Sequence, residues 1–239
     1  MRTGRFIVVD GIAGSGKTSI LDAASVWAKK CSHRIFDLRA WEEERKAPPL
    51  FEDVPNHDVY FTYEPTRVWI GAAIRHELSR TDLPYDGKTL AHAFAADRFI
   101  AYRRLIIPAL EAGKIVIQDR SVSTSIVYQP IMPDGYSLEQ LLTLPGNALA
   151  MQYPPDHLVI TRLPPEMAVG RLEGRQEESR GVFAELEYLK RVQERFESDW
   201  FRDLFQTRGT SIRFLDTSVE KEQMIENART IIDHILTTC

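Results

Sequence analysis

Cysteine and long apolar stretches are scarce in this sequence. Its two cysteines, Cys31 and Cys239, stand in no metal-binding or redox spacing, which excludes a disulfide-rich scaffold and favours a reducing compartment. The apolar run Phe6 to Val9 is too short for the core of a secretory signal. No stretch approaches the roughly 20 apolar residues of a membrane-spanning helix. We therefore expect a soluble, cytoplasmic protein without a membrane partner.

An excess of positive charge is missing as well. With 30 basic and 34 acidic residues the formal net charge is −4, whereas surfaces that bind nucleic acid polymers are usually basic. Any phosphate chemistry must therefore come from a few individually placed basic side chains. The hydrophobic fraction of 44% and the charged fraction of 27% are ordinary for globular proteins. At this length we expect one α/β domain that spans residues 1–239.

Short apolar segments with β-branched residues alternate with longer segments of helical character. We expect strands at residues 6–10, 59–62, 115–117, 157–160 and 212–215. We expect helices at residues 18–30, 67–80, 88–112, 137–150, 165–175, 184–206 and 218–236. This alternation predicts a mainly parallel, five-stranded sheet with helices on both faces. Two segments with several prolines interrupt it: an irregular insertion at 32–58, with a short helix near 38–46, and a turn-rich loop at 129–137.

The segment between the first expected strand and the first helix is rich in glycine. It fits the pattern G-x-x-x-x-G-K-[ST] completely, through Gly11, Ile12, Ala13, Gly14, Ser15, Gly16, Lys17 and Thr18. Glycines let backbone N–H groups curl around phosphates, and the following helix adds the positive end of its dipole. In this pattern Lys17 reaches the β- and γ-phosphates of ATP, and the Thr18 hydroxyl helps to hold Mg²⁺. A glycine-rich turn without a nucleotide is the alternative, and both the pattern and its position argue against it.

Asp119 and Arg120 follow the strand expected at 115–117, and Glu64 follows the strand expected at 59–62. Ligands of open α/β sheets bind at the carboxyl edge of the strands. Asp119 could bind Mg²⁺ directly or through water, and Arg120 offers a planar fork to a phosphate or carboxylate. The alternative for this pair is an ion pair that caps the strand. Glu64 could accept a hydrogen bond from an acceptor hydroxyl, hold a basic side chain, or pair with Arg67 on the surface.

Further segments follow one another in a recognisable order. They are Phe94-Ala-Ala-Asp97-Arg98, Ile107-Pro-Ala-Leu110, Gly113, Asp119-Arg120, Tyr128-Gln129, Pro155-Asp156 and Pro164-Pro165-Glu166. Together with the glycine-rich loop they resemble the thymidylate kinase family, over Phe6 to about Trp200. The resemblance implies the three-layer P-loop nucleoside/nucleotide kinase fold with a mobile lid. It also implies Mg²⁺-dependent transfer of the ATP γ-phosphate to a deoxynucleoside monophosphate, chiefly dTMP to dTDP.

The same resemblance implies where the acceptor nucleotide lies. Phe94 would stack on its base and Arg98 would hydrogen-bond the edge of the base. Thr124 or Ser125 would line the base pocket. Acceptor recognition would thus rest on residues of the predicted helix at 88–112 and of the segment that follows Arg120.

The resemblance also implies a phosphate side and a lid. Arg120 would hold the acceptor phosphate, and Tyr128 would crowd the ribose 2′ position. Residues 171–180 look like the family's lid, whose Arg175 and Arg180 would neutralise the transferring phosphoryl group, because this P-loop has no arginine of its own. The alternative is that the lid arginines pair with nearby glutamates on a solvated surface. A homodimer through the helix around 90–110 is implied by the resemblance alone.

Some positions depart from the thymidylate kinase pattern. Ala13 replaces a carboxylate of the P-loop, and Ser121 replaces an aromatic residue after the Asp-Arg pair. Tyr63 stands where many members have arginine, and Thr66-Arg67 replaces paired glycines. Arg67 is then a candidate substitute for the arginine that is missing.

These departures resemble the deoxynucleoside kinases, as do the segments Glu64 to Trp69 and Asp119 to Ser121. In that alternative Glu64 is the general base for a nucleoside 5′-hydroxyl, assisted by Arg120. A monophosphate oxygen is already anionic, so it needs cations and no base. The long helix around 94–113 and the Tyr128-Gln129 pair favour the monophosphate enzyme. A non-catalytic P-loop regulatory module is the third alternative, although the guanine-reading Asn/Thr-Lys-x-Asp motif of GTPases is missing.

Overall fold

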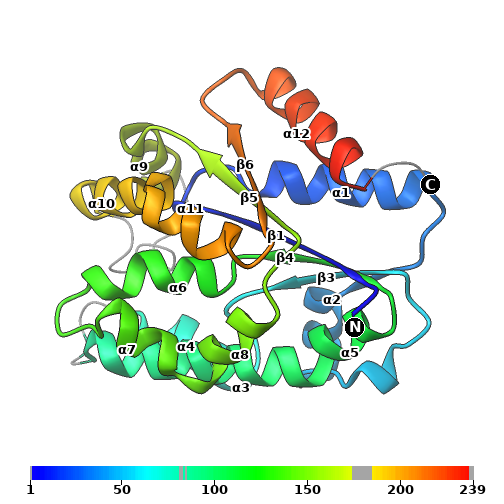
Figure 1. The fold of residues 1–239 in the computed structure, drawn as a ribbon, viewed down its shortest axis with the longest axis horizontal. Coiled ribbons are helices and arrows are strands. Elements are labelled where there is room, and N and C mark those ends of the chain that lie inside the picture. Colours follow the sequence, from blue (N-terminus) through cyan, green and yellow to red (C-terminus); the bar gives the residue numbers. More distant parts are fainter. Residues whose placement is uncertain (1, 81–82, 84, 174–184, 237–239) are drawn as a thin grey trace.

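A single parallel sheet forms the centre of the molecule (Figure 1). The computed structural model describes residues 2–80, 83, 85–173 and 185–236. The strands are β1 (Arg5–Gly11), β2 (Ile35–Asp37), β3 (Val59–Tyr63), β4 (Ile115–Asp119), β5 (His157–Arg162) and β6 (Ser211–Asp216). Their order across the sheet is β2-β3-β4-β1-β5-β6, and every pair is parallel. The connection that leaves β1 runs to β2 at one edge of the sheet, whereas the connection that leaves its neighbour β5 runs to β6 at the other edge. The sheet therefore has a topological switch point beside β1, where α/β sheets bind ligands.

Twelve helices are described on the two faces and edges of this sheet. They are α1 (Thr18–Lys30), α2 (Leu38–Arg45), α3 (Trp69–Ala73), α4 (Gly87–Ala101), α5 (Ile107–Glu111), α6 (Val122–Tyr128), α7 (Leu138–Thr143), α8 (Pro145–Gln152), α9 (Pro165–Glu173), α10 (Leu186–Glu197), α11 (Asp199–Gln206) and α12 (Lys221–Leu236). Shorter turns are π-helical at Ile74–Leu78 and Tyr102–Ile106 and 3₁₀ at Phe51–Asp53 and Gln129–Ile131.

Alternate residues of β1 face two different cores, because successive side chains of a strand point to opposite faces. Ile7 and Val9 belong to the core that includes residues of α1 and α12. Phe6 and Val8 belong to the larger core on the other face, which includes residues of α4, α6, α10 and α11. All four side chains are fully buried. Figure 1 shows α1 and α12 side by side on one face and α4, α6 and α8 on the other, which confirms the predicted helix–sheet–helix layers.

The sheet has six strands rather than the five predicted, and one helix was missed. The extra strand, β2, is a three-residue edge strand inside the segment predicted to be irregular, too short to show a strand period. The missed helix is α6, which contains serine, threonine and β-branched residues of modest helix propensity. Most of its side chains are buried, so tertiary packing outweighs propensity there.

Two long predicted helices are each divided in two. Pro145 begins α8 directly after α7, since a proline at the first helical position lacks only an N–H that would have no partner in the helix. The segment predicted as 184–206 is interrupted at Ser198, whose hydroxyl accepts the N–H of Phe201 and caps α11. The helix predicted at 88–112 continues through α4, a π-helical turn and α5.

The insertion at 32–58 is ordered and contains the predicted short helix, which is α2. Asp37 caps this helix by accepting the N–H of Arg39 at 2.8 Å. Leu38 and Glu42 are the buried residues of α2, so one face of the helix packs on the domain. The insertion is therefore a wall of the molecule beside β3.

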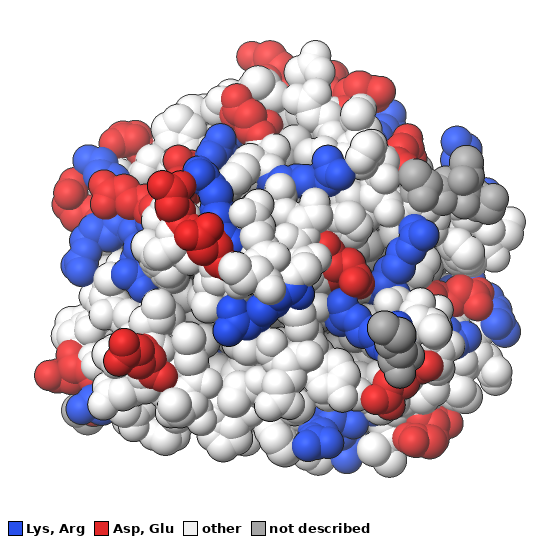
Figure 2. Space-filling view, in the orientation of Figure 1, with Lys and Arg blue, Asp and Glu red and all other residues white. Residues whose placement is uncertain are grey.

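Composition led to expectations about charge, membranes and cysteines. Basic and acidic side chains are interspersed over the face shown in Figure 2, as the small net charge predicts. Within the described residues, no helix combines the length and apolar character needed to cross a membrane. Cys31, directly after α1, is disulfide-bonded, so the expectation of reduced cysteines does not hold at this residue.

Candidate active site

The P-loop leaves the carboxyl end of β1 and leads into α1. Its backbone enters the left-handed region at Gly11, Gly14 and Gly16, with φ of 139°, 76° and 82°. A Cβ at Gly11 would collide with Thr161 of the neighbouring strand, so glycine is required there by space as well as by conformation. The Ser15 hydroxyl donates to the carbonyl of residue 12 at 2.7 Å, which holds the curl of the loop from inside.

Lys17 directs its ammonium group into this loop. Its Nζ donates to the carbonyl of Ile12 at 2.9 Å and to that of Gly11 at 3.4 Å. The helix α1 begins at the next residue, Thr18, whose side chain is exposed. The loop backbone, the ammonium group and the helix N-terminus together make a place that favours phosphate anions.

Asp10, directly before the loop, is a fully buried carboxylate that the sequence analysis did not single out. It accepts hydrogen bonds from the hydroxyls of Ser123 at 2.5 Å and Thr124 at 2.7 Å, and from the N–H of Gly11 at 2.8 Å. Burial raises the pKa of Asp10, and the charge of Arg120, 3.5 Å away, opposes that rise. An acidic residue at the end of an otherwise apolar strand was the signal that could have revealed it.

Arg120 and Tyr128 connect the end of β4 to the P-loop. Arg120 takes a left-handed φ of 63°, and its Nη1 donates to the carbonyl of Gly11 at 3.1 Å. Its guanidinium lies over the ring of Tyr128, 5.9 Å from the centroid. The Tyr128 hydroxyl in turn accepts the N–H of Ala13 at 3.1 Å. Two residues predicted for the acceptor side therefore contact the loop predicted for ATP.

Glu64 and Arg98, 34 residues apart, form an ion pair inside the protein. Nε and Nη2 of Arg98 donate to Oε2 of Glu64 at 2.9 and 2.6 Å. Gln118 donates to the other carboxylate oxygen at 2.9 Å. Arg98 also donates to the hydroxyl of Ser125 at 3.0 Å and to the side-chain oxygen of Asn147. Gln118 and Asn147 were not predicted, because uncharged polar residues in a strand and a helix carry no motif.

The surroundings of Glu64 distinguish between the roles proposed for it. Its side chain is 4% exposed, and it pairs with Arg98 rather than Arg67, whose partner is Glu43 at 3.1 Å. Burial raises the pKa of Glu64 to about 7, while the Arg98 charge opposes the rise. Of the alternatives considered, holding a basic side chain is the one that the geometry displays.

Asp119 ends β4 opposite Tyr63 of β3. Its Oδ2 lies 3.5 Å from Arg39, and its Oδ1 is buried without a hydrogen-bond partner among the described residues. That oxygen and the exposed Thr18 hydroxyl are hard oxygen donors of the kind that Mg²⁺ prefers. The described part of the chain contains no group of three or more His, Cys, Asp or Glu side chains that could hold a metal. Mg²⁺ needs no such cage, since it is commonly held by one or two protein oxygens and the nucleotide, so these residues fit it.

Comparison with known proteins gives this site a context. A family model described as thymidylate kinase matches residues 50–227, well over half of the chain. The chain belongs to the thymidylate kinase family. It is accordingly an ATP-dependent phosphotransferase, and the resemblance deduced from the motifs is confirmed.

Relatives extend the thymidylate kinase match beyond that range. A probable thymidylate kinase of Pyrococcus abyssi is 28% identical over 240 residues, which cover 98% of this chain and 98% of the relative. A probable thymidylate kinase of Methanoculleus marisnigri is 30% identical over 80% of this chain and 78% of its own length. The thymidylate kinase of Caldicellulosiruptor saccharolyticus is 31% identical over 71% of this chain and 70% of its own length.

The remaining residues predicted for the acceptor site lie on α4 and α6. Phe94 precedes Arg98 by one helical turn, so the two side chains share a face of α4, and Phe94 is partly buried against the main core. Ser125 contacts Arg98, whereas Thr124 donates to Asp10 at 2.7 Å. The structure thus brings Phe94, Arg98 and Ser125 to one region and places Thr124 nearer the P-loop.

The predicted lid is described only in part. Arg175 and Arg180 lie outside the described residues. Arg171, near the end of α9, donates to the carbonyl of Thr217 at 2.9 Å. A Cβ built on Gly16 would lie 3.5 Å from Nη1 of Arg171, so this arginine lies beside the P-loop.

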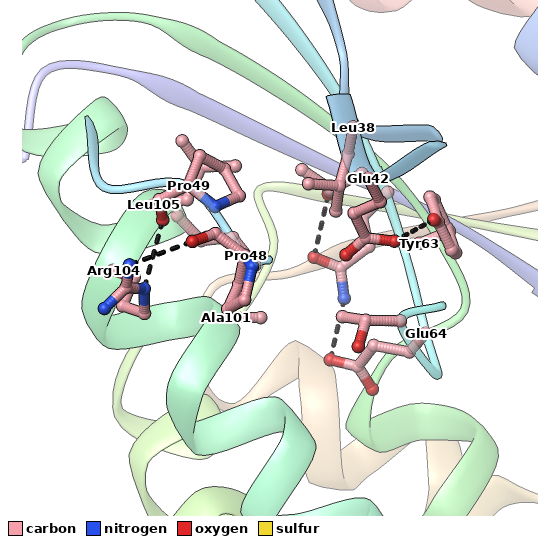
Figure 3. A pocket seen from close by; sticks show the side chains of 13 residues that line it. Leu38, Glu42, Pro48, Pro49, Tyr63, Glu64, Ala101, Arg104 and Leu105 are labelled. Atoms are coloured by element: carbon pink, nitrogen blue, oxygen red, sulfur yellow. Dashed lines mark hydrogen bonds between the residues drawn. The ribbon is translucent and has the colours of Figure 1, made fainter. Parts of the chain in front are cut away.

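A small cavity lies behind Glu64, between the 32–58 insertion and the turn at 102–106. In Figure 3, Arg104, Pro48 and Pro49 form one wall, and Glu42 and Glu64 lie at the other. Arg104 donates to the carbonyls of Pro48 at 2.9 Å and Pro49 at 3.3 Å, which ties the insertion to the helical layer. With about 10 Å³ the cavity has room for about one water molecule, so it is not the nucleotide pocket.

Proposed function

We propose that this enzyme transfers the γ-phosphate of ATP to dTMP in a Mg²⁺-dependent reaction. The observation that carries the proposal is the contact of Arg120 and Tyr128 with the P-loop, because it puts an acceptor-phosphate ligand beside the donor's phosphates. The names of the relatives support the choice of dTMP. Bound Mg²⁺ would neutralise charge on the ATP phosphates, with oxygen ligands from Thr18 and Asp119.

The donor side is made by the loop from Gly11 to Thr18. Its N–H groups and the N-terminus of α1 bind the ATP phosphates. The ammonium group of Lys17 stabilises the negative charge of the phosphoryl group during its transfer. Arg175 and Arg180 are proposed to complete this charge environment from the lid, which also excludes water from the reaction. Catalysis here consists of positioning and charge stabilisation.

The acceptor side is made by β4, α4 and α6. Arg120 and Arg67 hold the phosphate of dTMP, Phe94 stacks on its base, and Ser125, of the two candidates Thr124 and Ser125, lines the pocket. Arg98 was predicted to bind the edge of the base, but it is 1% exposed and its N–H groups donate to neighbouring side chains. Its proposed role is therefore to position Ser125, to which it donates at 3.0 Å. Tyr128 borders the ribose and excludes a 2′-hydroxyl.

The alternative acceptor is a nucleoside. It is favoured by Ala13, which leaves the P-loop without the usual carboxylate, and it needs Glu64 as a general base. A base must approach the hydroxyl proton within hydrogen-bond distance. Glu64 is buried, and Arg98 and Gln118 occupy both of its oxygens. These contacts support the monophosphate as acceptor.

Release of ADP from ATP–Mg²⁺ with dTMP, thymidine and the other deoxynucleosides tests the proposal directly. We expect turnover with dTMP and no turnover above background with thymidine, because a nucleoside lacks the anion that the arginines bind and Glu64 is not accessible as a base. Omission of Mg²⁺ should abolish the reaction. Turnover with nucleosides alone would overturn the proposal and make Glu64 the base.

Replacement of Phe94 by alanine tests the proposed base pocket. Loss of base stacking, worth about 1–3 kcal/mol, should raise the KM for dTMP roughly 5- to 150-fold and leave the KM for ATP nearly unchanged. Phe99→Ala is a matched control, because Phe99 lies on the same helix and is 37% exposed. An unchanged KM for dTMP in Phe94→Ala would remove this residue from the pocket.

Three further expectations stay predictions: that residues 1–239 form one domain, that the enzyme is a homodimer through α4, and that it acts in the cytoplasm.

A further inference from the structure

The insertion helix α2 is fastened to the loop that follows β3. Glu42, on the buried face of α2, is 2% exposed and accepts hydrogen bonds from the Tyr63 hydroxyl and from the N–H of Arg67, the latter at 2.9 Å. Figure 3 shows Glu42 and Tyr63 directed toward each other across this junction. The position of α2 is therefore coupled to the segment that contains Glu64 and Arg67.

Three guanidinium groups from separate elements gather around the ring of Tyr63. Arg39 of α2 lies 5.1 Å from the ring centroid. Arg67 of the loop after β3 and Arg75 of the π-helical turn each lie 5.7 Å from it. We call Arg39, Arg67 and Arg75 the Tyr63 arginine cluster. Its place is the carboxyl end of β3, next to Asp119 on β4.

Carboxylates lie around this cluster, and the charges of Asp97 and Asp119 both act on Arg75. Arg39 lies 3.5 Å from Asp119, and Arg67 lies 3.1 Å from Glu43. Arg75 donates to the backbone carbonyls of residues 65 and 66, which are neutral. Tyr63 adds no charge, because burial raises the pKa of its phenol well above the usual value. Arg39 and Arg67 are 44% and 45% exposed, so an anion can reach them.

A phosphate that reached this cluster would meet three guanidinium groups at once. Guanidinium groups bind phosphate through two parallel hydrogen bonds, and several converging arginines are a common means of phosphate recognition. The cluster surrounds the last residue of β3, beside β4, and Arg120, the proposed ligand of the acceptor phosphate, directly follows β4. Both therefore face the carboxyl edge of the sheet, where the acceptor binds.

We propose that the Tyr63 arginine cluster binds the phosphate of the acceptor nucleotide, with Arg39 of the insertion as a specificity-determining ligand. The inference rests on the proposed function, because it concerns the same acceptor site, and it commits that site to a deoxynucleoside monophosphate. It also explains how the enzyme works with Tyr63 at a position where many family members have arginine. The cations come from α2, the loop and the π-helical turn and surround the tyrosine ring instead.

Binding measurements separate this role from a structural one. Isothermal titration calorimetry at fixed salt would compare dTMP, dCMP, dAMP and dGMP with their nucleosides on the wild type, Arg39→Ala and Arg39→Lys. Arg39→Ala should weaken the monophosphate that the wild type binds roughly 10- to 100-fold, because a hydrogen bond to a charged group is lost. Binding of the matching nucleoside and of ATP should stay within about twofold. Arg39→Lys should recover part of the loss, since it restores the charge without the planar fork.

Arg45→Ala is the matched control. Arg45 lies on the same helix, is 59% exposed and stacks on Trp41 instead of Tyr63, so its loss should not change monophosphate affinity. Unchanged monophosphate affinity in Arg39→Ala, or an equal loss for nucleosides, would overturn the inference. So would a wild type that binds nucleosides as tightly as monophosphates. If the affected monophosphate is not dTMP, the inference stands and the proposed choice of substrate fails.

Discussion

Replacement of Lys17 by alanine is expected to lower the rate of phosphoryl transfer by roughly 1000-fold or more. The physical reason is that charge on the phosphoryl oxygens must be stabilised while the group is transferred, in a site from which water is excluded. The Lys17 ammonium already points into the loop, at 2.9 Å from the carbonyl of Ile12. Steady-state ADP release, with the acceptor that the wild type uses, measures the loss.

The shape of the loop should survive this substitution. Its curl depends on the glycines and on the Ser15 hydroxyl, none of which changes, so the melting temperature of Lys17→Ala should stay near that of the wild type. Lys29→Ala is the control, because Lys29 lies exposed on the same helix and should leave turnover unaffected. Turnover of Lys17→Ala within about tenfold of the wild type would contradict the assigned role.

Replacement of Arg98 by methionine is expected to lower the free energy of unfolding by about 3–5 kcal/mol. The substitution keeps apolar volume but leaves Glu64 buried without its cation, and both residues are at most 5% exposed. Urea denaturation at pH 7 measures the effect. Arg103→Met, at an exposed position two residues after the end of α4, should change stability far less. A loss below about 1 kcal/mol in Arg98→Met would show that the pair is not structurally important.

A second substitution separates loss of the pair from loss of packing. Glu64→Gln in the Arg98→Met background removes the uncompensated carboxylate, so the double variant should be more stable than Arg98→Met alone.

The contribution of Glu64 to the free energy of unfolding depends on pH with a defined sign. Burial raises the pKa of Glu64 to about 7, above its unfolded value, so its contribution to stability is present at low pH and is lost as pH rises through 7. Without Arg98 this decline between pH 5 and 8 should be steeper, and Glu64→Gln should abolish it.

The longer strands and the P-loop could be predicted from short stretches of sequence. The five longer strands were recognised because each is a compact apolar run, and the P-loop because its glycines are needed at fixed spacing. Edge strand β2 and helix α6 escaped for opposite reasons. β2 is too short for its pairing with β3 to be visible, and α6 is helical through burial against β1, α4 and α10 rather than through its own residues.

The candidate site was less predictable, because its contacts join residues far apart in the chain. Arg98 was assigned to the base edge, and nothing in the sequence shows that Glu64, 34 residues earlier, would take two of its N–H groups. Asp10 ends a predicted strand, but its partners Ser123 and Thr124 come from a helix that was not predicted. Arg39 is the clearest case. It lies in the short helix expected near 38–46, where no motif marks it, and only the docking of α2 through Glu42 brings it to the ring of Tyr63.

The hydrogen bond from the Ala13 N–H to the Tyr128 hydroxyl joins the proposed ATP site to the proposed acceptor site, so we expect the two sites to be thermodynamically dependent on each other. Ala13 belongs to the loop proposed to bind ATP, and Tyr128 belongs to the wall proposed for the acceptor. Any adjustment of the loop on nucleotide binding changes the free energy of this shared contact, and so changes the affinity for the acceptor. Reciprocity then requires the acceptor to change the affinity for ATP by the same factor, so that occupancy of one site is communicated to the other without a moving domain.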